Sequence, residues 1–172
     1  MNIRAAGMAV GMGVGILIAI ILIKFFNRNK SLTTQYDERQ KMIRGEAYKY
    51  AFYTLVIYEG ILCVILTGRS LPVDPFVLHF GGIALGIAVQ AGYSIWNGAY
   101  IGQNTNIRRF IITMILISVF NLVIGIMSWR DGFMIVDGVL QSTSVNLMFA
   151  VLFGILGIVG LIRKMVPVED DE

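Results

Sequence analysis

Glu59 is the residue most suited to chemistry in this sequence, because it is the one charge within the apolar stretch Tyr50–Gly68. An ionisable side chain inside a membrane span is costly, and it marks a functional site by default. Three roles fit such a residue. It can lock two helices together through a hydrogen bond, contact a partner or ligand, or couple the protein to proton movement.

Three polar residues of other apolar stretches are candidate partners for Glu59, and depth along the expected spans ranks them. At about 1.5 Å per residue, Glu59 lies roughly 18 Å from the inner end of its span. Asn121 lies at a similar depth, His79 is nearer the outer end of its span, and Gln90 is nearer the inner end. We therefore expect an intramembrane polar site formed by Glu59 and Asn121, with His79 as the second candidate.

The sequence carries no pattern typical of an enzyme or a metal protein. It has one histidine and one cysteine, His79 and Cys63, so no His or Cys ligand set stands at metal-binding spacing. It contains no HExxH, no GxSxG and no glycine–lysine phosphate loop. We expect a non-enzymatic protein with no metal and no cofactor.

Five apolar stretches must position these residues. Each is long enough to cross a bilayer core of about 30 Å as a helix of roughly 20 residues. The chain is 56% hydrophobic and 15% charged, whereas soluble domains carry about 25% charged residues. These features predict a single membrane domain, 1–172, that is an all-α bundle of five transmembrane helices. The expected spans are 5–24, 48–68, 76–96, 110–129 and 145–162.

Basic residues are concentrated on one side of these spans. Eleven of the 14 Lys and Arg residues lie in the 24–49 loop, in the connection before residue 110 and in the tail 163–172. The positive-inside rule then places the N-terminus outside and the C-terminus, with the loop 25–47, in the cytoplasm of a cell membrane. The basic 24–49 loop either binds anionic lipid headgroups or only sets the topology. Since the basic residues flank spans, we expect no nucleic-acid partner.

Local signals place a helix start and two turns in the connections. Thr34 and Asp37 resemble a capping box, which predicts a juxtamembrane helix over Tyr36–Lys49 that continues into the 48–68 span. In the outer loop, Asp131-Gly132 and Asp137-Gly138 are turn signals. A partner or ion site in that outer loop is the alternative to a plain connection.

Glycines stand four apart on two of the expected spans. Small residues at this spacing let membrane helices approach closely. The faces that they form serve either internal packing or contact with a membrane-protein partner or a second copy of the chain. The glycines are Gly7, Gly11 and Gly15 on the first span and Gly82 and Gly86 on the third.

The juxtamembrane segment 36–52 carries a sequence pattern that resembles one in other membrane proteins. The residues Tyr36-Asp37-Glu38-Arg39-Gln40, followed by Arg44-Gly45-Glu46-Ala47-Tyr48-Lys49-Tyr50-Ala51-Phe52, resemble a pattern in uncharacterised small multi-span membrane proteins of Gram-positive bacteria. The resemblance implies a bacterial cytoplasmic membrane and carries over no activity or site. We therefore expect an accessory or interaction subunit that associates through glycine-rich helix faces. The alternative is a small transporter or channel component that uses Glu59.

Overall fold

A computed structural model describes residues 13–14, 17–18, 20–21, 35–102 and 106–166. The chain divides into two compact units, Met1–Gln35 and Tyr36–Glu172. In the first unit, the residues described between 13 and 21 are helical and exposed. Most of the expected first span, with Gly7, Gly11 and Gly15, lies outside the described residues.

The second unit is built from four long helices among its described residues. They are α2 (Glu38–Gly68), α3 (Pro75–Trp96), α4 (Ile107–Arg130) and α5 (Val145–Met165). By length and composition, each of these helices is able to cross a membrane. Each also contains one of the four expected spans from 48–68 onward, because an uninterrupted apolar run favours a helix that satisfies its own backbone hydrogen bonds in lipid.

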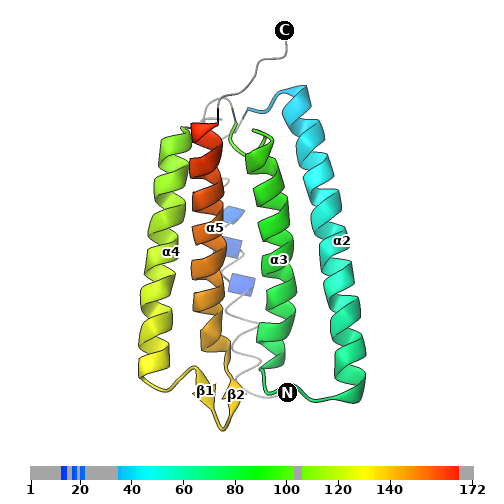
Figure 1. Ribbon diagram of the computed structural model, residues 1–172, viewed down its shortest axis with the longest axis vertical. Helices are drawn as coiled ribbons and strands as arrows, with labels where there is room; N and C mark the ends of the chain where they lie inside the picture. The colour runs from blue at the N-terminus through cyan, green and yellow to red at the C-terminus, as the bar shows by residue number, and fades with distance from the viewer. Residues whose placement is uncertain (1–12, 15–16, 19, 22–34, 103–105, 167–172) are drawn as a thin grey trace. The chain divides into compact units, whose positions relative to one another are not determined.

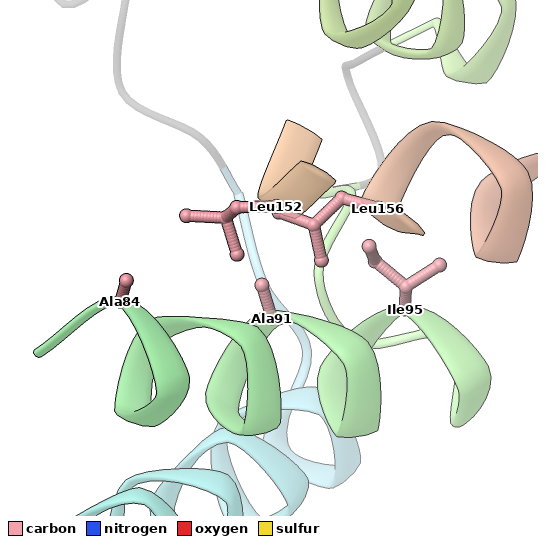
Figure 2. Packing of buried hydrophobic residues seen from close by; sticks show 5 residues of the cluster. All are labelled: Ala84, Ala91, Ile95, Leu152 and Leu156. Atoms are coloured by element: carbon pink, nitrogen blue, oxygen red, sulfur yellow. The ribbon is translucent and has the colours of Figure 1, made fainter. Parts of the chain in front are cut away.

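The helices of this unit pack in the order α2, α3, α5, α4 (Figure 1). Helix α5 therefore lies between α3 and α4, and α2 stands at the edge of the row with α3 as its neighbour. The core lies between α3 and α5, where two alanines and an isoleucine of α3 face two leucines of α5 (Figure 2). Its residues are Ala84, Ala91 and Ile95 of α3 and Leu152 and Leu156 of α5.

Helices α4 and α5 approach closely because small residues line their contact. Gly154, Gly157 and Gly160 of α5 all face side chains of α4. The Ser118 hydroxyl of α4 donates a 2.7 Å hydrogen bond to the Ala150 carbonyl of α5. Gly125 of α4 lies under the Leu147 side chain. Close backbone approach and interhelical hydrogen bonds are the usual means of association between membrane helices.

Both expected turns form between α4 and α5. Gly132 (φ +76°) ends α4, where its N–H bonds to the Trp129 carbonyl and the next N–H to the Ser128 carbonyl, a Schellman motif. Asp137 (φ +51°) and Gly138 (φ +75°) then join strands β1 (Ile135–Val136) and β2 (Val139–Leu140). Positive φ at both central residues is typical of the type I′ turn of a two-residue hairpin, and Asp-Gly is one of the sequences that this turn favours. A 3₁₀ turn, η2 (Ser142–Ser144), leads into α5.

The start of α2 corrects one expectation. Asp37, rather than Thr34, is the N-cap, and it forms a capping box with Gln40. Each member of this box satisfies a backbone N–H of the first turn. From there α2 runs without interruption over 31 residues to Gly68. Its length is about 46 Å at 1.5 Å per residue, which exceeds a bilayer core of about 30 Å.

Candidate functional site

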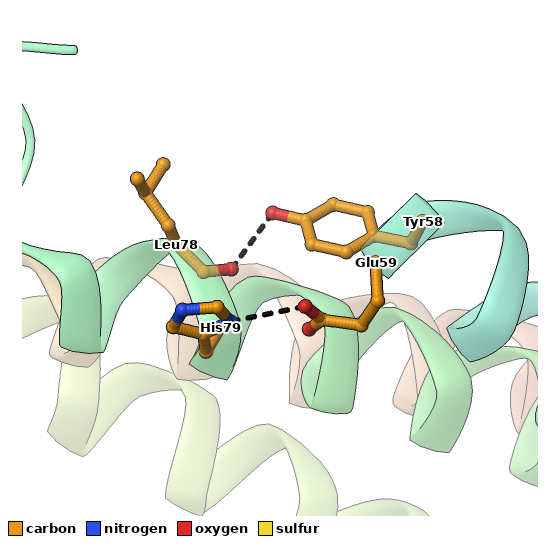
Figure 3. Close-up of polar contacts among 4 residues, drawn as sticks. All are labelled: Tyr58, Glu59, Leu78 and His79. Carbon is orange, nitrogen blue, oxygen red and sulfur yellow. Dashed lines mark hydrogen bonds and ion pairs between the residues drawn. The ribbon is translucent and has the colours of Figure 1, made fainter. Parts of the chain in front are cut away.

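Glu59 and His79 form an ion pair or hydrogen bond between α2 and α3. The Glu59 Oε2 atom lies 3.0 Å from His79 Nδ1, and Figure 3 shows the two side chains meeting between the helices. His79 is the fifth residue of α3, about 6 Å from the start of that helix. Glu59 is therefore level with the second turn of α3 rather than with its midpoint.

Asn121 lies elsewhere, so the ranking by depth is corrected. Its side-chain amide donates to the Ile117 carbonyl one turn earlier in α4, at 2.8 Å. Helix α5 packs between α3 and α4, which separates Asn121 from α2. Depth along a span does not determine which helices are lateral neighbours, and for this reason the second candidate, His79, is the residue that pairs with Glu59.

The aromatic ring next to Glu59 explains why α3 needs a glycine here. The Tyr58 hydroxyl donates a 2.8 Å hydrogen bond to the Leu78 carbonyl (Figure 3). This bond holds the Tyr58 ring against Gly82, where a Cβ atom would lie 2.6 Å from Tyr58 Cδ1 and 3.1 Å from Glu59 Oε1. At Gly86 a Cβ atom would lie 3.5 Å from the Ala51 carbonyl oxygen of α2. Both expected packing glycines of α3 therefore face α2.

The Glu59–His79 pair is not enclosed by the described residues. The side chain of His79 is 54% exposed and that of Glu59 is 33% exposed. Other surface residues of α2 are large and apolar, for example Phe52 and Val56. An apolar surface suits lipid, whereas an exposed ionisable pair at membrane depth needs water or another polar group.

A groove continues from this pair along the α2–α3 hairpin. Its volume is about 300 Å³. Residues 48, 52, 55 and 59 of α2 stand three or four apart, and so do residues 79, 83, 86 and 90 of α3, so each set occupies one helix face. We call this surface the hairpin face. Glu59 and His79 stand one helical turn beyond Leu55 and Ile83, respectively. The groove itself is lined by Tyr48, Ala51, Phe52, Leu55, Ile83, Gly86, Ile87 and Gln90.

A second polar cluster connects the start of α2 to the end of α3. It was not predicted from the sequence. Gln40 is buried, and its side-chain amide donates to the carbonyls of Gly98 at 3.0 Å and Ile101 at 3.3 Å. The same amide accepts the Asp37 N–H through its oxygen. Gly98 (φ +69°) lies in a Schellman motif that ends α3, which leaves its own carbonyl available to Gln40.

Tyr36 and Arg44 complete this cluster, which we call the clamp. The Tyr36 hydroxyl donates to the Tyr100 carbonyl at 3.2 Å and accepts from Arg44 Nη1 at 2.7 Å. The Arg44 guanidinium carbon lies 4.2 Å from the centre of the Tyr36 ring, within the range of a cation–π contact. Burial raises the pKa of the Tyr100 hydroxyl above its usual value. The four-residue spacing of Gln40 and Arg44 was the available signal, because it places them on one face of α2, whereas Tyr36 precedes the N-cap Asp37.

Nothing in the described residues resembles a metal centre. Within residues 35–102 and 106–166, no three His, Cys, Asp or Glu side chains lie close enough together to hold an ion. Comparison with protein-family models, with curated proteins and with solved structures finds no match to this chain. The function is therefore inferred from the hairpin face itself.

Proposed function

We propose that this chain is a non-enzymatic multi-pass membrane protein that works as an interaction subunit and binds a transmembrane helix of a partner on the hairpin face. The observation that carries the proposal is the exposed Glu59–His79 pair beside an apolar groove, on a helix at the edge of the row. Lipid tails cannot hydrogen-bond to such a pair, whereas a partner side chain can.

The shape of the hairpin face fits a helix better than a small polar substrate. The groove contains the small residues Ala51 and Gly86 between larger apolar ones, and small residues allow a helix backbone to approach closely. Its ends are polar, with Glu59 and His79 at one and Gln90 at the other. The partner helix is therefore apolar with at least one hydrogen-bonding side chain that faces Glu59 or His79.

The orientation of the protein in the membrane is part of the proposal. The charge distribution supports an N-terminus outside and a cytoplasmic C-terminus, and the resemblance of the juxtamembrane segment 36–52 implies a bacterial cytoplasmic membrane. The clamp then lies on the cytoplasmic side. The exposed basic residues Arg39, Lys41 and Lys49 of the 24–49 loop would face the anionic headgroups of that leaflet.

The second candidate function is a small transporter or channel component, which the ionisable character of the Glu59–His79 pair favours. Glu59→Gln separates the two functions. A glutamine keeps a hydrogen-bond acceptor for His79 and for a partner, so association should be retained. Proton or ion coupling requires the carboxylate, so transport would be lost.

The test is recovery of the partner with variants that fill the groove. The tagged protein is purified from native membranes into lipid discs, and co-purifying proteins are quantified by mass spectrometry. Ile83→Trp places an indole in the groove, and we expect at least a tenfold lower recovery, since about 1.4 kcal/mol is a factor of ten. Leu116→Trp on the exposed face of α4 is the matched control and should leave recovery unchanged. Equal recovery with both variants would argue against the hairpin face as the binding surface.

A further inference from the structure

A second groove lies at the other side of the unit, between the start of α4 and the end of α5. Its volume is about 320 Å³, and it is lined by Arg108, Ile111 and Ile112 of α4 and by Leu161 and Lys164 of α5. The helices meet at Gly160, where a Cβ atom would lie 3.2 Å from Ile111. One cation from each helix therefore borders the same apolar groove.

The charges at this end are not neutralised within the described residues. Arg109 and Arg163 are the sequence neighbours of Arg108 and Lys164, so four cations gather where α4 begins and α5 ends. The ion pair seen in the described residues is that of Glu59 with His79, which belongs to the α2–α3 hairpin. The first turn of α4 adds the partial positive charge of a helix N-terminus.

We propose that this groove binds an anionic phospholipid. The phosphate lies between Arg108 and Lys164, and an acyl chain lies along Ile112 and Leu161 over the buried Ile111. The positive charges of Arg108 and Lys164 favour an anion. The three aliphatic side chains favour a hydrocarbon chain attached to that anion. Basic pockets between membrane helices on the cytoplasmic side bind acidic lipids in this manner, and the positive-inside rule assigns this end to that side.

This site is independent of the hairpin face and differs from the basic 24–49 loop. A loop of exposed cations attracts a charged surface without selecting a single lipid. The α4–α5 groove instead combines two cations with an apolar wall, so it should retain individual lipid molecules when bulk lipid is removed.

The experiment is native mass spectrometry of the full chain in a neutral detergent, titrated with phosphatidylglycerol. A Lys or Arg near an anionic surface contributes about fivefold to binding, so Arg108→Gln with Lys164→Gln should weaken phosphatidylglycerol binding about 25-fold. The control pair Arg69→Gln with Arg130→Gln removes the same charge from the other end of the helices and should leave binding unchanged.

Three results would overturn the proposal. Equal weakening in both double variants would show an effect of net charge alone. Phosphatidylcholine binding as tightly as phosphatidylglycerol would show that the anion is not recognised. Displacement of the lipid by millimolar inorganic phosphate would show that the groove binds phosphate without a hydrocarbon chain. A double variant that elutes as an aggregate is replaced by Lys164→Gln alone, which should weaken phosphatidylglycerol binding about fivefold.

Discussion

Replacing Gly82 with alanine is expected to destabilise the α2–α3 hairpin by about 1–3 kcal/mol, the usual cost of overpacking a close contact. The new methyl group would lie 2.6 Å from Tyr58 Cδ1 and 3.1 Å from Glu59 Oε1. The Tyr58 ring is held by its hydrogen bond to the Leu78 carbonyl, so it cannot move away without losing that bond. The substitution should therefore separate Glu59 from His79 as well.

The measurement is reversible unfolding of the purified protein in mixed micelles at increasing denaturant. Gly92→Ala is the matched control, because it lies on the same helix and its Cβ would meet no atom within 4 Å. That variant should be neutral or slightly stabilising, since alanine has the higher helix propensity. If Gly82→Ala and Gly92→Ala unfolded alike, the tight contact of α2 with α3 at this point would be wrong.

Replacing Gln40 with alanine should cost about 1–3 kcal/mol of stability, because two or three hydrogen bonds of about 0.5–1.5 kcal/mol each are lost. Gln40 accepts the Asp37 N–H and donates to the Gly98 and Ile101 carbonyls. The loss should loosen the start of α2 from the end of α3, so amide hydrogen exchange should increase over residues 38–44 and 97–101. The start of α5, which lies at the opposite end of the helices from the clamp (Figure 1), should exchange as before.

Two further variants identify which function of Gln40 matters. Gln40→Glu keeps an oxygen for the Asp37 N–H but loses the donor to Gly98 and Ile101, so it should be destabilised nearly as much as Gln40→Ala. Arg39→Ala changes the exposed neighbouring residue and should leave both stability and exchange unchanged. A stable Gln40→Glu protein would show that the capping box, and not the clamp, is what Gln40 contributes.

The positions of the four long helices of the second unit could be predicted from the sequence, because each coincides with a long apolar run. The turns at Asp131-Gly132 and Asp137-Gly138 could be predicted as well, because positive φ at a turn selects glycine or a small polar residue. The spacing of Gly82 and Gly86 was enough to predict that they lie at a close helix contact. It did not predict that the helix they contact is α2.

The lateral order of the helices could not be predicted in this way. Asn121 matched Glu59 in depth, but the insertion of α5 between α3 and α4 places it in a different contact. His79 had a signal that depth does not include. Its helix follows α2 after the short connection from Arg69 to Asp74, and short connections make antiparallel neighbours. The clamp was missed because Gln40 donates its hydrogen bonds to the backbone carbonyls of Gly98 and Ile101. Every residue has such a carbonyl, so the sequence does not indicate which ones accept.

Cross-linking at Cys63 in native membranes tests the partner-binding hairpin face most directly. Cys63 is the single cysteine of the chain and is exposed, and it lies one turn beyond Glu59 on α2. A short thiol-linked photo-cross-linker should trap a discrete protein adduct, either a partner or a second copy of the chain, and Ile83→Trp should abolish it. An adduct that forms equally from a cysteine at Leu116 in a Cys63→Ala background, or no protein adduct at all, would contradict the account.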